Sequence, residues 1–428
     1  MALEVVTRFL SEVVRFLSCS ALWCAVMQMA NASFGITQTA YVIRSNPINK
    51  TPIHYVASTD EETVVIATNW GPGAQVAVPS SRDRAVYREI AKVGRAGMDE
   101  PVRVRIPGTM RSTWTSKPLS EGFVVTGTDW WYATLDDRDD AAATTFVKSD
   151  GSRATFVKPP ATTDPTRSNS WQTIVIPGEK PRALELTYLP EETIAREVDW
   201  SGASRSWQLP PVSYERVSRI VAQSLPDGRI VLLSNHDGLS LYLLADEGHV
   251  DAITLRNVRI QQFDAAIDGA GRIAIVAARN AARNPIVTAP NDTGTIDAAI
   301  IDPAYPDHAE LSSLRHDVRV TGQFREVQVV TTPDGFAAAW INELGGRRIE
   351  ATDVDRRGRG GPVVEVGQAS PRGEAAFLGV QAKHDELLFW WDDGEHLFQR
   401  RLPVSLRGYA ILNDFAQLFC GKAEPHHE

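Results

Sequence analysis

The sequence predicts an all-β fold, a β-propeller of seven blades with four antiparallel strands each. Seven short apolar stretches recur along the 428 residues, each entered from a turn rich in Gly, Asp or Glu. A spacing of roughly 40 to 65 residues indicates stacked units, and the scarcity of helical periodicity favours radially packed four-stranded blades. Six or eight blades remain alternatives. The seven stretches are Thr63 to Trp70, Gly122 to Trp130, Arg182 to Tyr188, Gly228 to Asn235, Gly271 to Arg279, Gly335 to Asn342 and Glu386 to Asp392.

One blade can be assigned strand by strand in the middle of the chain. Its turns carry Asp-Gly or Glu-Gly pairs, in which Gly accepts a positive φ and Asp hydrogen-bonds nearby amides. Four strands joined by three tight turns make one complete blade. We expect these strands at Ser218 to Ser224, Arg229 to Asn235, Ser240 to Ala245 and Val250 to Leu255.

This blade also carries a resemblance to a known family. Leu225 to Gly238 reads LPDGRIVLLSNHDG, and Leu241 to Gly248 reads LYLLADEG. The pattern resembles the repeat of TolB-like (PD40-repeat) periplasmic β-propellers: a Ser-Pro-Asp-Gly turn, an apolar strand, a polar turn, Ile-Tyr and a second turn. Thr332 to Asp355 and Glu386 to Leu402 resemble it more loosely, and the first three units lack the Pro-Asp-Gly turn. The resemblance implies the fold and, because such propellers are mostly interaction modules, it implies no activity.

The first residues predict export. The apolar stretch Phe16 to Met27 is followed by Ala30-Asn31-Ala32, a pattern that signal peptidase cleaves. The stretch is short for a bilayer span, which needs about 20 apolar residues. We therefore expect residues 1–32 to be an export signal peptide, a periplasmic or secreted protein, and no stable membrane anchor after cleavage. A retained signal anchor is the alternative.

The remaining chain predicts one domain. We expect a single propeller over 33–420 with an inserted flexible hairpin at 136–169, where Thr-Phe-Val-Lys occurs twice between polar, Pro-rich flanks, and a disordered tail at 421–428. Thr37 to Arg44 is expected to close the ring by joining the blade that ends with Val404 to Leu412.

Charge and motifs exclude several classes of function. The net charge of −9 argues against a nucleic-acid partner, since phosphate binding needs a concentrated basic surface. The chain has no G-x-S-x-G elbow, H-E-x-x-H helix, Walker loop or Cys/His spacing suited to zinc. The sequence therefore assigns no catalytic residue, no metal ligand and no cofactor.

Polar and aromatic residues recur where the predicted second strand of each blade ends. Flat aromatic rings beside carboxamides and carboxylates suit a carbohydrate or peptide groove. The alternative is structural, because Trp packs between blades and Asn or Asp caps turns. The candidate rim consists of Trp70, Asp129, Trp130, Trp131, Asn235, His236, Asp237, Asn342, Trp391 and Asp392.

These observations predict an exported, non-enzymatic propeller that binds a protein or glycan partner through one loop-rich face. That face receives the long connections Arg82 to Pro101, Asp136 to Asn169 and Asn280 to Gly294. The alternative is a hydrolase or lyase on the same scaffold, with acidic and histidine residues at the channel mouth. An enzyme should gather carboxylates in one pocket, whereas a binding module should present a broad aromatic surface.

Overall fold

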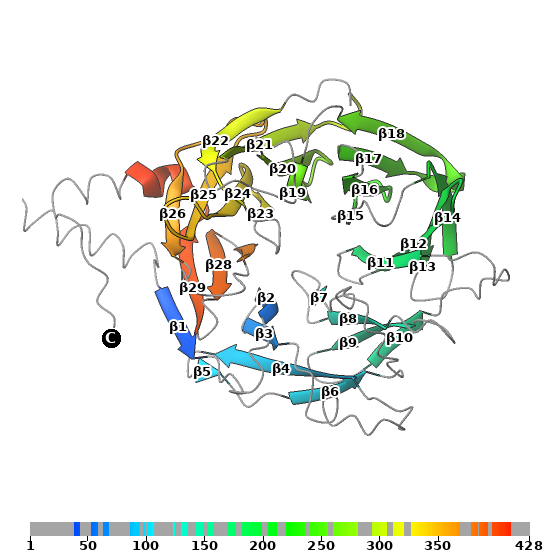
Figure 1. Ribbon diagram of the computed structural model, residues 1–428, viewed down its shortest axis with the longest axis horizontal. Coiled ribbons are helices and arrows are strands. Elements are labelled where there is room, and N and C mark those ends of the chain that lie inside the picture. Colours follow the sequence, from blue (N-terminus) through cyan, green and yellow to red (C-terminus); the bar gives the residue numbers. More distant parts are fainter. Residues whose placement is uncertain are drawn as a thin grey trace, which may run out of the picture.

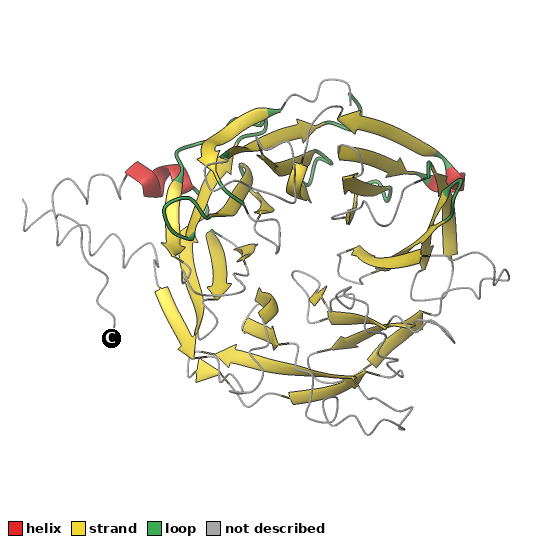
Figure 2. Cartoon of the chain, viewed as in Figure 1, coloured by secondary structure: helices red, strands yellow, loops and turns green. Residues whose placement is uncertain are grey.

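In a computed structural model, nearly all of the regular secondary structure among the described residues is β-strand (Figure 2). Side chains are described from Ile174 onward. Among the described residues, no helix has the length and apolar character needed to cross a membrane. The structure describes residues 38–42, 53–58, 63–67, 86–94, 97–98, 102–106, 123–124, 130–135, 143–148, 153–157, 170–176, 182–198, 204–211, 220–235, 239–255, 260–280, 293–305, 311–320, 327–368, 378–383, 385–392 and 396–411.

The described strands form antiparallel sheets in chain order. The first sheet has the order β2 (Ile53–Ser58), β3 (Thr63–Ala67), β4 (Val86–Gly94) and β5 (Gly97–Met98), with β6 (Val102–Ile106) also paired to β4. The next has the order β7 (Phe123–Val124), β8 (Trp130–Leu135), β9 (Ala143–Lys148) and β10 (Arg153–Val157). The third has the order β11 (Ser170–Ile176), β12 (Arg182–Tyr188), β13 (Thr193–Val198) and β14 (Ser204–Leu209).

Four further sheets follow. One contains β15 (Ile220–Ser224), β16 (Ile230–Asn235), β17 (Leu239–Leu244) and β18 (Val250–Leu255), with a 3₁₀ turn, η2 (Asp246–Gly248), before β18. The next contains β19 (Ile260–Ile267), β20 (Ile273–Asn280), β21 (Gly294–Ile301) and β22 (Ser312–Val318). Another contains β23 (Val327–Thr332), β24 (Gly335–Asn342), β25 (Arg348–Val354) and β26 (Val364–Gln368). The last has the order β27 (Leu378–Lys383), β28 (Glu386–Asp392), β29 (His396–Pro403) and β1 (Gln38–Val42).

The sheets stand around a common axis, and the fold is a β-propeller (Figure 1). The first strand of each sheet lies innermost and contacts the first strand of a neighbouring sheet, as β19 does with β23 and β23 with β27. Side chains link these inner strands. The Asp264 carboxylate accepts a hydrogen bond from Val329 N at 2.9 Å, and Thr331 Oγ1 donates to Ile267 O at 3.0 Å.

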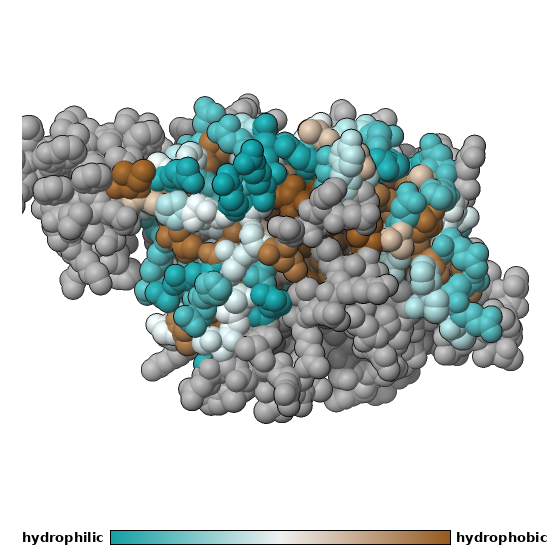
Figure 3. Space-filling model, turned by 90° about the horizontal axis from the view of Figure 1, so that it is seen from above, coloured by the Kyte–Doolittle hydropathy of each residue, from teal (hydrophilic) through white to brown (hydrophobic). Residues whose placement is uncertain are grey.

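The hydrophobic core lies between neighbouring sheets. Strand β24 is buried along its whole length, and its side chains alternate between two cores as the two-residue period of a strand requires. Ala337 and Ala339 pack towards β28, whereas Phe336 and Trp340 pack towards β20 and β21. Among the described residues visible in Figure 3, hydrophilic and hydrophobic residues alternate over the surface.

The N-terminal strand β1 joins the last sheet as expected, but with a different partner strand. Strand β1 pairs with β29, from Gln38 opposite Arg400 to Val42 opposite His396. The predicted strand Val404 to Leu412 does not form, because residues 406–411 are helical. Leu406, Tyr409 and Ala410 are buried at a spacing of three and four residues, which is the period of a helix.

The Thr-Phe-Val-Lys hairpin forms, but inside a sheet. Strands β9 and β10 pair with each other, and β9 also pairs with β8 from Trp130 opposite Lys148 to Leu135 opposite Ala143. The predicted insertion thus supplies the two outer strands of a four-stranded sheet. A strand with one face towards the core and one face towards solvent has polar residues at every second position. In sequence this pattern resembles a solvent-exposed loop.

Two turns of the fold share one structure, in which a Gly-Arg pair follows an aspartate. In the turns ending at Arg272 and Arg359 a glycine with φ near +80° precedes the arginine, whose guanidinium returns to the aspartate four residues earlier. The same aspartate accepts the arginine backbone N–H at 2.9 Å in both turns. Positive φ favours glycine, and the Asp–Arg contact holds the turn closed.

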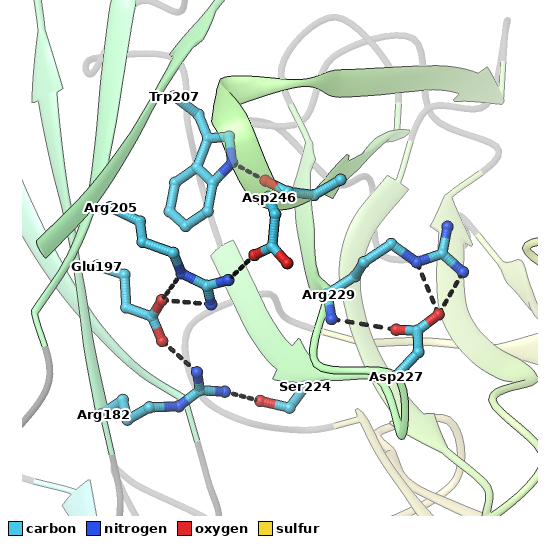
Figure 4. A network of polar contacts seen from close by, with 9 residues as sticks. Arg182, Glu197, Arg205, Trp207, Ser224, Asp227, Arg229 and Asp246 are labelled. Atoms are coloured by element: carbon cyan, nitrogen blue, oxygen red, sulfur yellow. Dashed lines mark hydrogen bonds and ion pairs between the residues drawn. The ribbon is translucent and has the colours of Figure 1, made fainter.

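Polar contacts also join two neighbouring sheets (Figure 4). Glu197 on β13 binds both Arg182 and Arg205, and Arg205 Nε lies 2.7 Å from Glu197 Oε2. Arg182 then reaches Ser224 on β15, and Arg205 reaches Asp246 in η2. The arginines and carboxylates of this network pair with one another. Because Ser224 and Asp246 belong to the neighbouring sheet, the network joins the two sheets.

Candidate functional site

Most of the predicted rim lies beyond what the structure describes in side-chain detail. Trp70, Asp129, His236 and Asp237 lie outside the described residues. Asn235 and Asp392 end β16 and β28 as predicted, but their side chains are outside the described part.

Trp130 and Trp131 occupy a different place from the one predicted. They begin β8 instead of ending a strand, since the predicted strand Gly122 to Trp130 is replaced by β7 and the start of β8. In an antiparallel sheet the start and the end of a strand lie at opposite edges. The two tryptophans therefore lie at the opposite face of the ring from Asn235 and Asn342.

Asn342 ends β24 as predicted and is 1% exposed. Its Oδ1 accepts hydrogen bonds from Leu344 N at 3.0 Å and Arg319 N at 3.2 Å. Its Nδ2 lies 3.3 Å from both carboxylate oxygens of Glu350. These bonds cap the β24–β25 turn and tie it to β22, which is the structural alternative weighed for such residues.

Trp391 is likewise buried, at 1% exposure. Its ring stacks on Phe398 at 5.4 Å between centroids, and its Nε1 donates to Gln368 O at 3.1 Å. A Cβ added to Gly367 would lie 2.5 Å from this ring. Trp391 therefore packs between two sheets, and its indole face is covered by protein.

A cleft of about 550 Å³ lies on the opposite face, where the first and third turns of each sheet emerge. We call it the Asp353 cleft. Its volume falls in the range of ligand pockets, roughly 300 to 1,000 Å³. It is lined by Thr332, Pro333, Asp334, Gly335, Phe336, Asp353, Val354, Asp355, Arg359, Gly360, Gly361, Val404, Ser405 and Arg407.

Three segments that are distant in sequence form the Asp353 cleft. The β23–β24 turn supplies Asp334, the end of β25 supplies Asp353, and the chain after β29 supplies Arg407. A Cβ on Gly335 would lie 2.6 Å from Val354 O, so glycine is needed where β24 starts beside the end of β25. This close approach forms part of the cleft wall.

Asp353 is fixed in place by the backbone of the next sheet. Its Oδ1 accepts a hydrogen bond from Leu406 N at 3.1 Å, and its Oδ2 accepts one from Arg407 N at 2.8 Å. These amides begin the helix of residues 406–411, so Asp353 caps it from a neighbouring sheet. Each carboxylate oxygen retains a second lone pair that can serve a ligand.

Burial raises the pKa of Asp353, and the negative charge of Asp334 raises it further. The backbone hydrogen bonds from Arg407 and Leu406 and the charge of Arg407 lower the pKa, but they do not outweigh burial. No guanidinium hydrogen-bonds to this carboxylate in the described part of the chain. A carboxylic acid that retains its proton to higher pH beside a second carboxylate suits acid–base chemistry.

The other charges of the cleft are arranged differently. Asp355 Oδ2 pairs with Arg359 Nη2 at 2.8 Å, and Oδ1 accepts Arg357 N at 2.8 Å. Burial raises the pKa of Asp355, but its bonds to Arg359 and Arg357 outweigh this and hold the pKa below its ordinary value. Within the described residues, Arg407 has no ion-pair partner, and no acidic, His or Cys group forms a metal site.

Sequence reasoning missed this cleft. In the sequence, Asp334 and Asp353 lie in the Thr332 to Asp355 stretch that loosely resembles a propeller repeat, and nothing there assigns either of them a role in a site. The available signal was topological: in an antiparallel sheet the first and third turns lie at one edge, which brings Asp334 and Asp353 together.

The chain was also compared with protein families, curated proteins and solved structures. No protein-family model and no curated protein sequence matches the chain. The chain is similar to polysaccharide lyase Uly1 (10% identity, 85% of this chain and 92% of that chain covered, TM-score 0.47). It is also similar to the β-propeller domain of the Trilobed protease from Pyrococcus furiosus (9%, 83% and 98%, 0.44) and to TolB from Acinetobacter baumannii (11%, 75% and 77%, 0.36).

The prediction of a non-enzymatic binding propeller is wrong in its basis. It inferred an interaction module from the resemblance to TolB-like propellers, that is, from the fold alone. Shared architecture does not decide between catalysis and binding, so the argument must come from the site. That site gathers carboxylates in one cleft, and the two rim residues whose side chains are described, Asn342 and Trp391, are buried.

Proposed function

We propose that the protein is an exported hydrolase that cleaves a glycosidic bond in the Asp353 cleft. The observation that carries this proposal is the pairing of Asp353, whose pKa is raised, with Asp334 in one cleft. Glycosidases use two carboxyl groups, one that gives a proton to the leaving oxygen and one that acts as base or nucleophile. The two aspartates supply this pair.

Asp353 serves as the general acid. Its raised pKa keeps part of the population protonated at a higher pH than an ordinary aspartic acid, and the two backbone donors orient the group. Asp334 lies on the exposed β23–β24 turn and serves as the second carboxylate. Arg407 binds hydroxyl or carboxylate oxygens of the sugar, since its guanidinium has no ion-pair partner in the described residues.

A lyase is the second candidate, and Arg407 favours it. Elimination from a uronate sugar needs a cation that neutralises the sugar carboxylate and a base that removes the neighbouring proton. Arg407 and Asp334 line the same cleft and supply these two groups. The substrate class, a neutral or an acidic glycan, separates the two reactions.

The proposal includes a seven-bladed ring and export. Each of the seven sheets is one blade, and pairing of β1 with β29 supports closure by the two ends of the domain. The apolar segment Phe16 to Met27 with its Ala-x-Ala site supports a periplasmic or secreted location, where soluble polysaccharides are accessible. The partner is then the glycan itself.

The test measures turnover of neutral and uronate polysaccharides by the wild type and by Asp353→Asn and Asp334→Asn. Reducing ends report hydrolysis, and ultraviolet absorbance of unsaturated products reports elimination. We expect each substitution to lower kcat/KM by about 10²- to 10³-fold. Asp227→Asn, in an exposed turn of another sheet, is the matched control and should retain activity. Full activity of Asp353→Asn, or no cleavage of any polysaccharide by the wild type, would overturn the proposal.

A further inference from the structure

A buried carboxylate lies at the other end of β25 from the Asp353 cleft. Glu350 is 3% exposed, and its Oε2 accepts a hydrogen bond from Trp340 Nε1 at 2.9 Å. Asn342 Nδ2 lies 3.3 Å from both of its oxygens. Neutral donors from β24 therefore occupy this carboxylate.

Two arginines converge on the same carboxylate from different sheets. Arg315 Nε on β22 lies 3.6 Å from Glu350 Oε2, and Arg348 Nη2 on β25 lies 3.6 Å from Oε1. Both distances exceed that of a hydrogen bond, so the ion pairs are loose. The Nε atoms of both arginines are buried and have no hydrogen-bond partner among the described residues.

A third arginine adds to the positive charge. Arg319 follows β22, its backbone N–H donates to Asn342 Oδ1, and its buried Nε is also without a partner within the described part of the chain. The neighbouring Arg347 is neutralised by Glu343 at 2.7 Å. Among the described residues, Glu350 is the carboxylate that Arg315 and Arg348 approach, and Arg319 is joined to it through Asn342, so arginines outnumber carboxylates in this cluster.

We propose that this cluster, Arg315, Arg319 and Arg348 around Glu350, is a binding site for an oxyanion such as phosphate, sulfate or a carboxylate. Guanidinium groups bind such anions through paired hydrogen bonds, and a bound oxyanion would supply acceptors and charge that Glu350 does not. The side chains of Arg315 and Arg348 are 40% and 32% exposed, so their outer nitrogens are accessible. The site is independent of the Asp353 cleft.

Calorimetric titration of the full chain at constant ionic strength tests the site. The probes are inorganic phosphate, inorganic sulfate and an oligogalacturonate, which separate a free oxyanion from the acidic group of a glycan. We expect saturable binding of at least one probe, weakened about tenfold or more by Arg315→Gln and by Arg348→Gln. Arg401→Gln is the matched control, because Arg401 forms a surface ion pair with Glu386 at 3.5 Å.

A second variant distinguishes a ligand site from a structural cluster. Glu350→Gln removes the one competing carboxylate and keeps a side chain of the same shape, so it should tighten anion binding by about threefold or more. Thermal unfolding without anion identifies any variant that does not fold. If the arginine variants do not fold, anion binding by Glu350→Gln alone tests the proposal. No binding of any probe by the wild type, or weaker binding by Glu350→Gln, would overturn the proposal.

Discussion

Two aspartates on the same face of the ring, Asp268 and Asp353, differ in the charged groups that surround them. Each accepts two backbone N–H hydrogen bonds: Asp268 from Ala270 and Arg272, Asp353 from Leu406 and Arg407. Asp268 also binds the Arg272 guanidinium, with Nε at 2.7 Å from Oδ2. Asp353 instead faces the carboxylate of Asp334.

The pKa values of these aspartates move in opposite directions. Burial raises the pKa of both groups, but the bonds with Arg272 outweigh burial and lower the pKa of Asp268. At Asp353 the amide donors and the charge of Arg407 together do not outweigh burial. The comparison teaches that a guanidinium bonded directly to the carboxylate lowers the pKa of a turn aspartate in this fold, and no such bond to Asp353 occurs among the described residues.

Removing the cation should make Asp268 resemble Asp353, and this is the largest effect that we expect. Arg272→Met leaves a carboxylate that is 7% exposed without its guanidinium. We expect a loss of about 2 to 3 kcal/mol in the free energy of unfolding, below the cost of a fully buried pair because Arg272 is partly exposed. Urea denaturation at neutral pH measures it. Arg229→Met, in the exposed turn with Asp227, should cost less than about 1 kcal/mol; an equal cost in both variants would contradict the explanation.

Removing the charge of Asp268 should give a stability difference that depends on pH. The lowered pKa means that the ionised carboxylate stabilises the fold above the ordinary value of 3.8, and that this contribution disappears as pH falls through the folded-state pKa. Asp268→Asn should therefore be about 1 to 2 kcal/mol less stable at neutral pH. The difference should shrink below pH 3.8. Thermal unfolding of both proteins from pH 7 downward tests this, and a constant difference would exclude the linkage.

The same substitution at Asp353 should give the opposite slope. The raised pKa means that protonated Asp353 favours the fold, and that this contribution is lost as pH rises through the folded-state pKa. Relative to Asp353→Asn, the wild type should gain stability as pH falls towards 3.8. We expect a change within about 1 kcal/mol, because the backbone donors remain available to Asn. Parallel slopes for the two aspartates would show that Arg272 does not cause their difference.

The sequence predicts the second strands of several sheets well. The predicted strands Arg182 to Tyr188, Gly335 to Asn342 and Glu386 to Asp392 coincide with β12, β24 and β28. Such strands are buried on both faces, so they read as continuous apolar runs between turn residues. The pairing of β9 with β8, and of β10 with β9, cannot be inferred from local pattern.

Predictions failed where a distant segment decides the structure. The helix at residues 406–411 contains the strand-like sequence Leu-Arg-Gly-Tyr-Ala-Ile, but its first amides are capped by Asp353 from another sheet. The candidate rim followed the ends of second strands, so it could not include Asp334 and Asp353 at the opposite edge. Burial of Asn342 and Trp391 depends on neighbouring sheets, which no local pattern describes.

Pairing of β1 with β29 also sets an order of events during folding. Strand β1 is synthesised before every other described strand, yet its partner lies at residues 396–403. Until that partner is made, β1 has no neighbour within its sheet, and unpaired strands invite association with other chains. Contacts between such distant residues form slowly because a long loop must close first. Ring completion should therefore be the late, slow step of folding, and the interval before it the time when the protein is most prone to aggregate.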